Sequence, residues 1–335
     1  MKAPFTYFGG KSKVAGEVWR RFGKVRNYLE PFAGSAAMLL KRPRSTVVNA
    51  SHDHDWGIET INDADGLVSN FWRAMRHCPE ELIYHANWPV NEADLHARHL
   101  WLVNQKEVLA EKLMGDPEWC DPKAAGWWLW GMCAWIGSGY CSGQGSWISL
   151  HGMLVSKGEI DAAGVVRKLP HIGNSGMGIN RTIPHIGDSG FVGEDQVRHH
   201  LSPLINRLRL VRVACGDWKR ILGAGADESM GSCAVFLDPP YSEGDIDYNS
   251  GDRSVTHDVR KWCIENFHRS HMKIALCGYD TEHEELEGVG WSAYRWSTNG
   301  GYLGGGGGDG EKNRHRETIW FSPSCDNEEL QPGLF

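Results

Sequence analysis

One short segment combines the groups needed to hold an aromatic amine. Asp238-Pro239-Pro240-Tyr241 follows the apolar run Ala234–Leu237, and open α/β sheets bind ligands beyond the carboxyl ends of such strands. Asp238 and the Pro239 carbonyl can accept both N–H bonds of an exocyclic amino group, while Tyr241 stacks on its ring. This would draw the nitrogen toward sp3 geometry and free its lone pair for attack, by positioning and electrostatics and with no metal or covalent intermediate. The alternative is an ordinary strand-end turn, stiffened by its prolines, with Tyr241 in the core.

Two segments at strand ends have the composition of a nucleotide site. Glu30-Pro31-Phe32-Ala33-Gly34-Ser35 lies between an expected strand and an expected helix, where Gly34 permits a tight turn and close approach of a ligand to the backbone. The segment is not G-x-G-x-x-G, which disfavours a dinucleotide. Asn62-Asp63 ends the next expected strand, where the Asp63 carboxylate can accept both hydroxyls of a ribose. The alternative role of Asp63 or Asp65 is to cap the following helix.

A glycine-rich segment near the N-terminus invites comparison with a phosphate loop. The segment is Tyr7-Phe8-Gly9-Gly10-Lys11. It lacks the G-x-x-x-x-G-K-[ST] spacing of that loop, so we expect no ATP hydrolysis.

Alternating strands and helices predict the sheet that positions these segments. One strand is expected over 27–32 and a second strand is expected to end at residue 63. Further strands are expected over 210–215, 233–237 and 273–277, and a closing antiparallel pair is expected over 292–296 and 317–321. Helices are expected over 35–41, 67–75, 92–113, 123–136, 194–208 and 258–268. This order is typical of a nucleotide-binding α/β domain. We expect residues 1–78 and 194–335 to form the catalytic domain and residues 79–193 to form a helical and loop-rich insertion.

The second half of the expected insertion contains an internal duplication. The sequence of 169–176 (LPHIGNSG) is echoed fourteen residues later by 183–190 (IPHIGDSG). Two copies are too few for a solenoid. The duplication is either a paired turn motif in a surface loop or a pair of loops that lies on a ligand such as DNA.

Charge is distributed unevenly along the chain of 335 residues. The net formal charge is −7, but residues 1–45 carry +8 and residues 165–212 carry +4. The total argues against a nonspecific polyanion binder, whereas the basic segments allow one positive face. Nine cysteines without a C-x-x-C pair favour reduced thiols over a disulfide framework or a zinc site. With no signal-peptide pattern and no apolar run long enough to cross a bilayer, we expect a soluble, cytoplasmic protein. We also expect it to be a monomer.

Taken together, the motifs resemble those of the Dam-like DNA N6-adenine methyltransferases of the alpha group, most closely the phage and prophage versions. That family runs from F/W-x-G-G-K through E-P-F-x-G-[SG] and an acidic residue after the second strand to a target-recognition insertion and D-P-P-Y. This chain has all four motifs in that order. The resemblance covers roughly residues 1–75 and 210–322. In the segment between these two ranges, the chain resembles only the phage-type members, and it does so in residues 127–147 and in the repeats. It implies a Rossmann-like methyltransferase sheet with a target-recognition insertion.

The resemblance implies S-adenosylmethionine as the methyl donor and indicates its site by position. Tyr7, where Dam itself has tryptophan, and Lys11 match positions that line the cofactor site. Glu30, Phe32 and Gly34 match the family's loop under the methionine portion of the cofactor. Asp63 matches the acceptor of the ribose hydroxyls, and Asp217 and Trp218 match the residues that hold the adenine. The catalytic motif that receives the target base matches Asp238, Pro239, Pro240 and Tyr241.

The implied partner is double-stranded DNA, from which the target base must be flipped out of the stack. The expected DNA contacts are Tyr140, Gln144, Trp147, Arg181 and Arg314. Phosphate contacts are expected among Arg20, Arg21, Lys24, Lys41, Arg42, Arg44, Arg167, Lys168 and Arg181. For each of these cations a solvated surface charge is the alternative. The tryptophans at 127, 128, 130 and 135 have helical spacing and are expected in the core of the insertion.

The resemblance does not indicate which DNA sequence is recognised, or whether the specificity is relaxed. It also leaves open a role in restriction-modification. The alternative reaction is N4-cytosine methylation, in which Ser commonly replaces the first Asp of the motif, so Asp238 favours adenine. The alternative from another class is a catalytically silent DNA-binding relative, against which the intact Asp238 and Tyr241 argue.

Overall fold

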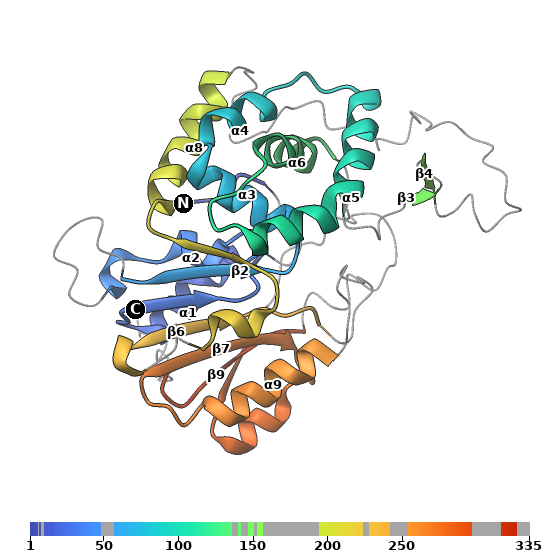
Figure 1. The fold of residues 1–335 in the computed structure, drawn as a ribbon. Helices are drawn as coiled ribbons and strands as arrows, with labels where there is room; N and C mark the ends of the chain where they lie inside the picture. Colours follow the sequence, from blue (N-terminus) through green and yellow to red (C-terminus); the bar gives the residue numbers. More distant parts are fainter. Residues whose placement is uncertain are drawn as a thin grey trace, which may run out of the picture.

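The computed structural model describes residues 1–5, 7, 10–47, 57–135, 140–141, 147–150, 153–156, 194–223, 228–241, 254–296 and 316–326. These residues form an α/β structure with a seven-stranded mixed sheet in the order β5-β2-β1-β6-β7-β9-β8, and a separate pair, β3-β4. Figure 1 shows the large sheet in the lower part of the molecule and a group of helices above it. The predicted α/β class is confirmed.

Five neighbouring strands of the large sheet run parallel. They are β1 (Asn27–Glu30), β2 (Glu59–Asp63), β5 (Arg212–Cys215), β6 (Cys233–Leu237) and β7 (Met272–Tyr279). The chain places β2 and β5 on one side of β1, and β6 and β7 on the other. The direction of winding therefore reverses between β1 and β6, and ligands of open α/β sheets bind at such a switch point, beyond the carboxyl ends of the strands.

An antiparallel strand near the sheet's end brings one more residue to the carboxyl edge. β9 (Glu317–Phe321) runs antiparallel to both β7 and β8 (Ser292–Arg295), as the sequence predicts for this pair. Its first residue, Glu317, pairs with Tyr279 at the end of β7. The start of β9 thus lies at the same edge as the carboxyl ends of the parallel strands.

Helices cover both faces of the sheet. α1 (Ala15–Phe22) and α2 (Ala37–Lys41) share an apolar core with Ala234 and Phe236 of β6, whereas α9 (Ser254–Asn266) packs with Val235 and Leu237. This division follows from the pleat, because successive side chains of a strand point to opposite faces. All of β6 is buried, as expected for a parallel strand covered on both faces. Short 3-10 helices are η1 (Lys11–Lys13), η2 (Arg44–Thr46), η3 (Trp218–Ile221), η5 (Glu228–Met230) and η6 (Glu284–Val289).

The upper helices pack around α6 (Pro122–Ala134). Its neighbours are α3 (Gly66–His77), α4 (Pro79–Ala86) and α5 (Glu92–Gly115), and α8 (Glu194–Leu208) packs against α3 and α4. α6 begins as predicted, because Asp121 Oδ1 accepts a hydrogen bond of 2.8 Å from the Ala124 N–H and Pro122 follows the cap. Gly126 permits the close contact with α4, since a Cβ there would lie 2.5 Å from the Cβ of His85.

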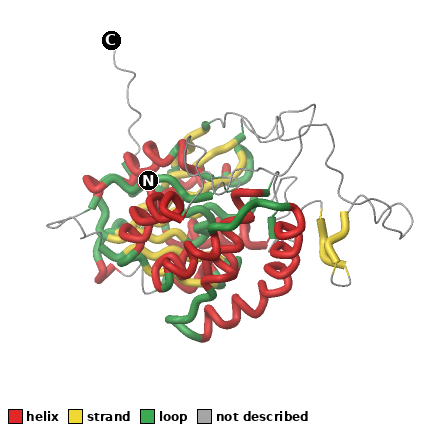
Figure 2. The backbone as a smooth tube through the Cα atoms, turned by 90° about the horizontal axis from the view of Figure 1, so that it is seen from above, coloured by secondary structure: helices red, strands yellow, loops and turns green. Residues whose placement is uncertain are grey.

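The predicted catalytic part and insertion share one core within the described residues. Trp72 of α3 and Trp128 of α6 belong to the same apolar cluster as Tyr28 of β1, so the boundary at 78/79 stays a prediction. Figure 2 shows β3 (Trp147–Leu150) and β4 (Met153–Ser156) as a hairpin at the periphery. Over the ranges that the structure describes, we find no helix with the length and apolarity needed to cross a membrane.

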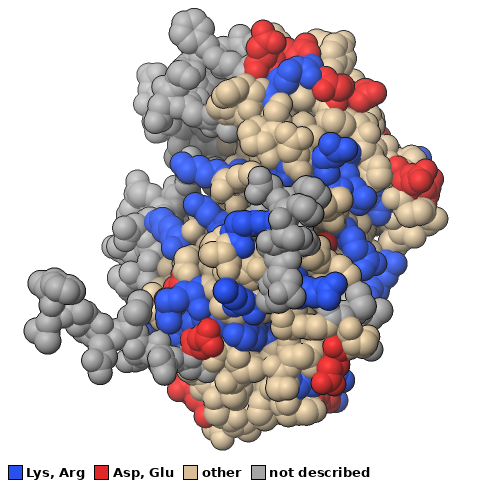
Figure 3. Space-filling model, turned by 90° about the vertical axis from the view of Figure 1, so that its left-hand side faces the viewer, with Lys and Arg blue, Asp and Glu red and all other residues tan. Residues whose placement is uncertain are grey.

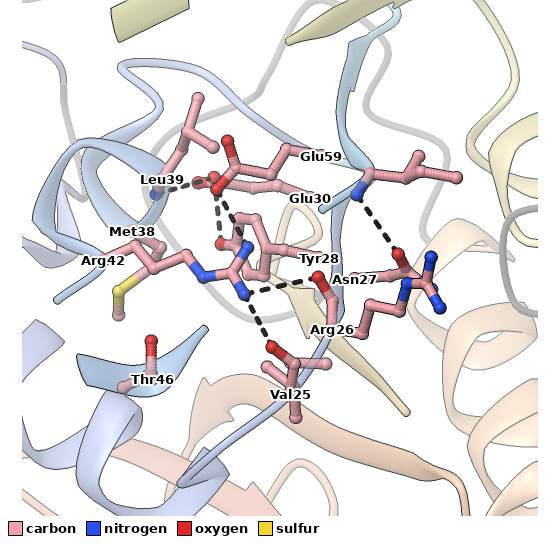
Figure 4. A network of polar contacts seen from close by, with 12 residues as sticks. Val25, Arg26, Asn27, Tyr28, Glu30, Met38, Leu39, Arg42, Thr46 and Glu59 are labelled. Carbon is pink, nitrogen blue, oxygen red and sulfur yellow. Dashed lines mark hydrogen bonds and ion pairs between the residues drawn. The ribbon is translucent and has the colours of Figure 1, made fainter. Parts of the chain in front are cut away.

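A buried ionic network joins α8 to the start of β2, and Figure 4 shows the part of it that Arg42 and Glu59 form. Glu59, at the start of β2, is 1% exposed. Its carboxylate accepts hydrogen bonds of 2.6 and 2.7 Å from Arg207 of α8 and one of 2.9 Å from Arg42, which follows α2. Arg42 also donates to the Val25 carbonyl at 2.8 Å. One carboxylate therefore binds two guanidinium groups from separate parts of the chain.

Substitution of Glu59 by glutamine should destabilise the fold by roughly 3–5 kcal/mol, because two buried guanidinium groups lose their shared carboxylate. Urea denaturation measures this free energy of unfolding. Arg209→Met removes an exposed cation just beyond α8 and, as the control, should stay within about 0.5 kcal/mol of wild type. A loss below about 1 kcal/mol for Glu59→Gln, typical of an exposed ion pair, would contradict the role of the network.

Candidate active site at the carboxyl edge of the sheet

The carboxyl edge of the sheet brings together acidic residues that are far apart in the sequence. Glu30 and Asp63 end β1 and β2, and Asp217 and Asp238 follow β5 and β6. Glu317 reaches the same edge because β9 is antiparallel to β7. The motifs predicted to act together are thus positioned by strand ends on both sides of the switch point between β1 and β6.

Lys11 lies between two of these carboxylates. Its Nζ is 3.1 Å from Asp238 Oδ1 and 3.6 Å from Glu317 Oε2, and its side chain is 4% exposed. The Tyr241 hydroxyl lies 3.0 Å from Glu317 Oε2 and 3.3 Å from Asp238 Oδ1, where it can donate to either oxygen. The Nζ atom also lies 5.2 Å from the centre of the Tyr241 ring. We call Lys11, Asp238, Tyr241 and Glu317 the Lys11 cluster.

The Lys11 cluster has uneven electrostatics. Burial raises the pKa of the Glu317 carboxyl, and the negative charge of Asp238 raises it further, while Lys11 and the Tyr241 hydroxyl act in the opposite direction. A carboxylate with a raised pKa binds a proton more readily than an ordinary one. Glu317 therefore accepts a proton more readily than an ordinary carboxylate, and the Tyr241 hydroxyl lies between it and Asp238.

Glu317 and its neighbour Tyr279 are site residues that the sequence argument missed. The ring centres of Tyr279 and Tyr241 are 4.7 Å apart in an edge-to-face arrangement, and the Arg316 guanidinium lies 5.0 Å from the Tyr279 ring centre. A signal was present, because an acidic residue opens an apolar strand at Glu317. Only the antiparallel direction of that strand places its first residue at the carboxyl edge.

The loop after β1 is fixed to the end of β2. The Gly34 N–H donates to Asp63 Oδ2 at 2.9 Å, and the Asp65 N–H donates to Asp63 Oδ1 at 2.8 Å. Burial, followed by the charge of Asp65, raises the pKa of Asp63 to about 6. The helix cap of α3 is Asp65, which accepts from the Leu67 N–H at 2.9 Å. Asp63 is therefore not the cap, and its carboxylate remains at the edge beside the loop.

Gly34 is required by its backbone and by Tyr7. Its φ of +46° lies in the left-handed region, and a Cβ at this position would lie 2.5 Å from Cε1 of the Tyr7 ring. The Gly34 carbonyl accepts from Trp72 Nε1 of α3 at 2.9 Å. The N-terminal segment and the helical group thus both hold this loop in place.

Asn62 connects the ends of three strands. Its Nδ2 donates to the carbonyls of Pro31 and Gly216, each at 3.0 Å. The backbone carbonyl of Asn62 accepts a hydrogen bond of 2.9 Å from the Ala33 N–H. The loops after β1 and β5 are therefore held at fixed positions relative to Asp63.

Two aromatic rings stand beside these loops. Phe32 and Trp218 have ring centres 6.0 Å apart with an angle of 32° between the ring planes. Trp218 is buried and Phe32 is half-buried. Asp217 is exposed, and its side chain caps η3 by accepting from the Lys219 N–H at 2.7 Å. In the predicted pair, Asp217 thus has a structural role as the cap of η3, and Trp218 provides an apolar ring beside the loops.

Glu30 lies beneath the loop and not in it. The carboxyl is 3% exposed and accepts from the Tyr28 hydroxyl at 3.0 Å and from the Leu39 N–H at 3.2 Å (Figure 4). Burial raises its pKa to about 8. Glu30 therefore supports the junction between β1 and α2 as a largely protonated acid at neutral pH.

None of the residues predicted to contact DNA is seen at this edge in the described part of the chain. Tyr140 is 7% exposed, and its ring packs 5.0 Å from that of His99 and 5.4 Å from that of Trp135. It is thus a core residue and leaves the set of expected base contacts. Trp147 opens β3, of which the structure describes only the backbone. The others, Gln144, Arg181 and Arg314, lie outside the described residues.

Several of the expected phosphate contacts are engaged within the protein. Arg42 is buried against Glu59. Arg20 and Arg21 donate through Nε to the Glu17 carboxylate at 2.8 and 2.7 Å. The burial of Arg21 and Arg42 corrects the expectation that these two residues hold DNA, whereas the partly exposed Arg20 pairs within its own helix and its phosphate contact stays a prediction. Arg167 and Lys168 lie outside the described residues.

Basic residues that are exposed or, for Arg44, half-buried gather at the opposite edge of the sheet. Lys24 and Arg26 precede β1, Lys41 ends α2, Arg44 begins η2 and Arg212 begins β5. Figure 3 shows lysines and arginines concentrated on this side of the molecule. The structure thus has a basic face, but it lies at the amino ends of the strands, away from the Lys11 cluster. Lys24, Lys41 and Arg44 are therefore not positioned to hold DNA at the candidate site.

No protein-family model matches this chain, and a search of curated protein sequences found no match.

The raised pKa of Glu30 predicts a specific dependence of stability on pH. A carboxyl with a raised folded-state pKa contributes stability that is fully present below its unfolded value, near 4.5, and is lost as the pH rises through about 8. Glu30→Gln keeps an acceptor for Tyr28 and Leu39 but cannot ionise. Between these two pH values we expect wild type to lose on the order of 3 kcal/mol of unfolding free energy relative to this variant.

Urea denaturation at a series of pH values gives the comparison. Glu265→Gln, on the exposed side of α9, is the control and should follow wild type at every pH. If wild type and Glu30→Gln instead gave parallel stability curves, the carboxyl would not be held in its neutral form.

Proposed function

We propose that the chain is an S-adenosylmethionine-dependent methyltransferase that modifies the exocyclic N6 amine of an adenine flipped out of double-stranded DNA. The observation that carries this proposal is the Lys11 cluster, in which the D-P-P-Y acid and aromatic ring lie against an N-terminal lysine at the switch point of the sheet. The ordered motifs of the sequence support the same function.

The residues of the neighbouring loops fit the proposed cofactor. The Asp63 carboxylate binds two backbone N–H groups, and each oxygen retains a lone pair that can accept a ribose hydroxyl. Phe32 and Trp218 offer apolar faces for the adenine, and the Gly34 turn admits a ligand close to the backbone. When bound, S-adenosylmethionine supplies an electrophilic methyl group on a sulfonium sulfur.

The D-P-P-Y segment would hold the target base by its amine. Asp238 and the Pro239 carbonyl accept the two N–H bonds, and Tyr241 packs on the ring of the base. Lys11 fixes the Asp238 carboxylate by an ion pair of 3.1 Å. The Thr256 hydroxyl donates to the Pro240 carbonyl, which holds the turn against α9. Asp238 is thus oriented before the base arrives, which is the form of electrostatic preorganisation that lowers a barrier.

Methyl transfer to the amine must be followed by loss of one proton from nitrogen. Asp238 is the first acceptor, because it binds an amine hydrogen. Glu317 is the second, because burial raises its pKa and the Tyr241 hydroxyl links it to Asp238. The Lys11 ammonium balances charge as the proton moves between the carboxylates.

The Asp238→Ala variant tests this function. We expect its rate of methyl transfer to duplex DNA to fall by roughly 10³-fold or more, because amine orientation and the first proton acceptor are both lost. Its dissociation constant for S-adenosylmethionine should change by less than about threefold, because Asp63 and the aromatic pair remain.

Asp195→Ala, which removes an exposed acid in the first turn of α8, is the matched control and should keep the wild-type rate. Near-normal turnover by Asp238→Ala would exclude the proposed mechanism. Cofactor binding by wild type without any methyl transfer would instead favour a catalytically silent DNA-binding protein.

A further inference from the structure

Two half-buried cysteines meet where α3, α4 and α6 join. Cys78 lies between the end of α3 and the start of α4, and Cys120 directly precedes Asp121, the N-cap of α6. The two thiols hydrogen-bond to each other. The structure describes all nine cysteines, and apart from this pair only Cys133 is half-buried, while the other six are buried.

Hydrogen bonds to α3 hold the segment that carries Cys120. Asn70 Nδ2 donates to the Asp121 carbonyl and the Asp121 N–H donates to Asn70 Oδ1, both at 2.8 Å. Arg73 donates to the carbonyls of Asp116 and Trp119 at 2.8 and 3.2 Å. Because Cys78 directly follows the last residue of α3, these contacts fix the position of one cysteine relative to the other.

Both thiols are accessible from a surface pocket. The pocket has a cavity volume of about 590 Å³, and Cys78 and Cys120 line it together with His77, Glu81 and Glu118. Across the part of the chain that the structure describes, no three or more His, Cys, Asp or Glu side chains are grouped to hold a metal ion. The chemistry to consider at this pocket is therefore that of the thiols themselves.

The surroundings make the two thiols unequal. The hydrogen bond from Cys78, together with the positive charge of Arg73, lowers the pKa of Cys120, and the same hydrogen bond raises the pKa of Cys78. The thiolate is the nucleophilic form of cysteine. Cys120 is thus the attacking group, and Cys78 is the neighbour that can resolve an adduct on it.

We propose that Cys78 and Cys120 form a reversible disulfide by exchange with a small disulfide such as glutathione disulfide. The Cys120 thiolate attacks one sulfur of glutathione disulfide, which forms a mixed disulfide and releases one glutathione thiolate. Cys78 gives up its proton, and its sulfur then attacks the Cys120 sulfur and releases the second glutathione. Two cysteine thiols are oxidised, and one glutathione disulfide is reduced to two molecules of glutathione.

The disulfide would close a loop that contains α4 and α5. Closing such a loop restricts the unfolded chain, so the helical group should unfold at a higher temperature in the oxidised protein. The transient, redox-responsive type is the kind of disulfide found in reducing compartments. This inference is independent of the proposed methyl transfer.

Peptide mapping of the full chain by mass spectrometry tests the proposal. After incubation with glutathione disulfide, we expect a cross-linked peptide containing Cys78 and Cys120, lighter by two hydrogens than the reduced pair and removed by dithiothreitol. Cys133→Ser is the matched control and should form the same cross-link to the same extent. The oxidised wild type should also show a raised midpoint of thermal unfolding.

Two further variants separate the roles of the thiols. Cys78→Ser should accumulate glutathione on Cys120, at least roughly tenfold faster than Cys120→Ser accumulates it on Cys78, because Cys120 is the readier thiolate. Glutathione bound to Cys120 of wild type without cross-linking, a cross-link to another cysteine, or equal rates in the two variants would each overturn the proposal.

Discussion

A buried ammonium group connects the separate parts of the candidate site. Lys11 Nζ lies 3.1 Å from Asp238 and 3.6 Å from Glu317, with almost no exposure to solvent. A charge taken out of water is tolerated only when opposite charges are near it, and two carboxylates brought together without a cation would repel each other. The pairing therefore requires the N-terminal segment, the end of β6 and the start of β9 to meet at one place.

The sheet positions the two halves of the proposed transfer site at one edge. On one side of the switch point, Asn62 and Asp63 hold the loops after β1 and β5, where the nucleoside portion of the proposed cofactor would bind. On the other side, Asp238 and Tyr241 lie against Lys11, where the proposed amine would bind. Because adjacent strands carry both halves, the donor and acceptor groups of the proposed reaction are positioned by the same rigid element.

Local patterns predicted the elements well because those elements are strongly apolar and clearly bounded. β6 at 233–237, β9 at 317–321 and α8 at 194–208 have the predicted bounds. The predicted cap of α6 at Asp121 is also present. The contacts between elements were less accessible. Nothing near Arg42 in the sequence indicates its pairing with Glu59, and the burial of Tyr140 depends on packing against α6. Glu317 joins the site only because β9 runs antiparallel.

Identification of the methylated base is the most direct test of the central claim. The purified chain would be incubated with unmodified duplex DNA and S-adenosylmethionine labelled in its methyl group, and the DNA then digested to nucleosides and separated. If the proposed reaction occurs, the label appears in N6-methyldeoxyadenosine and not in cytosine nucleosides. Label confined to N4-methyldeoxycytidine, or no label in DNA from a folded protein that binds S-adenosylmethionine, would contradict it.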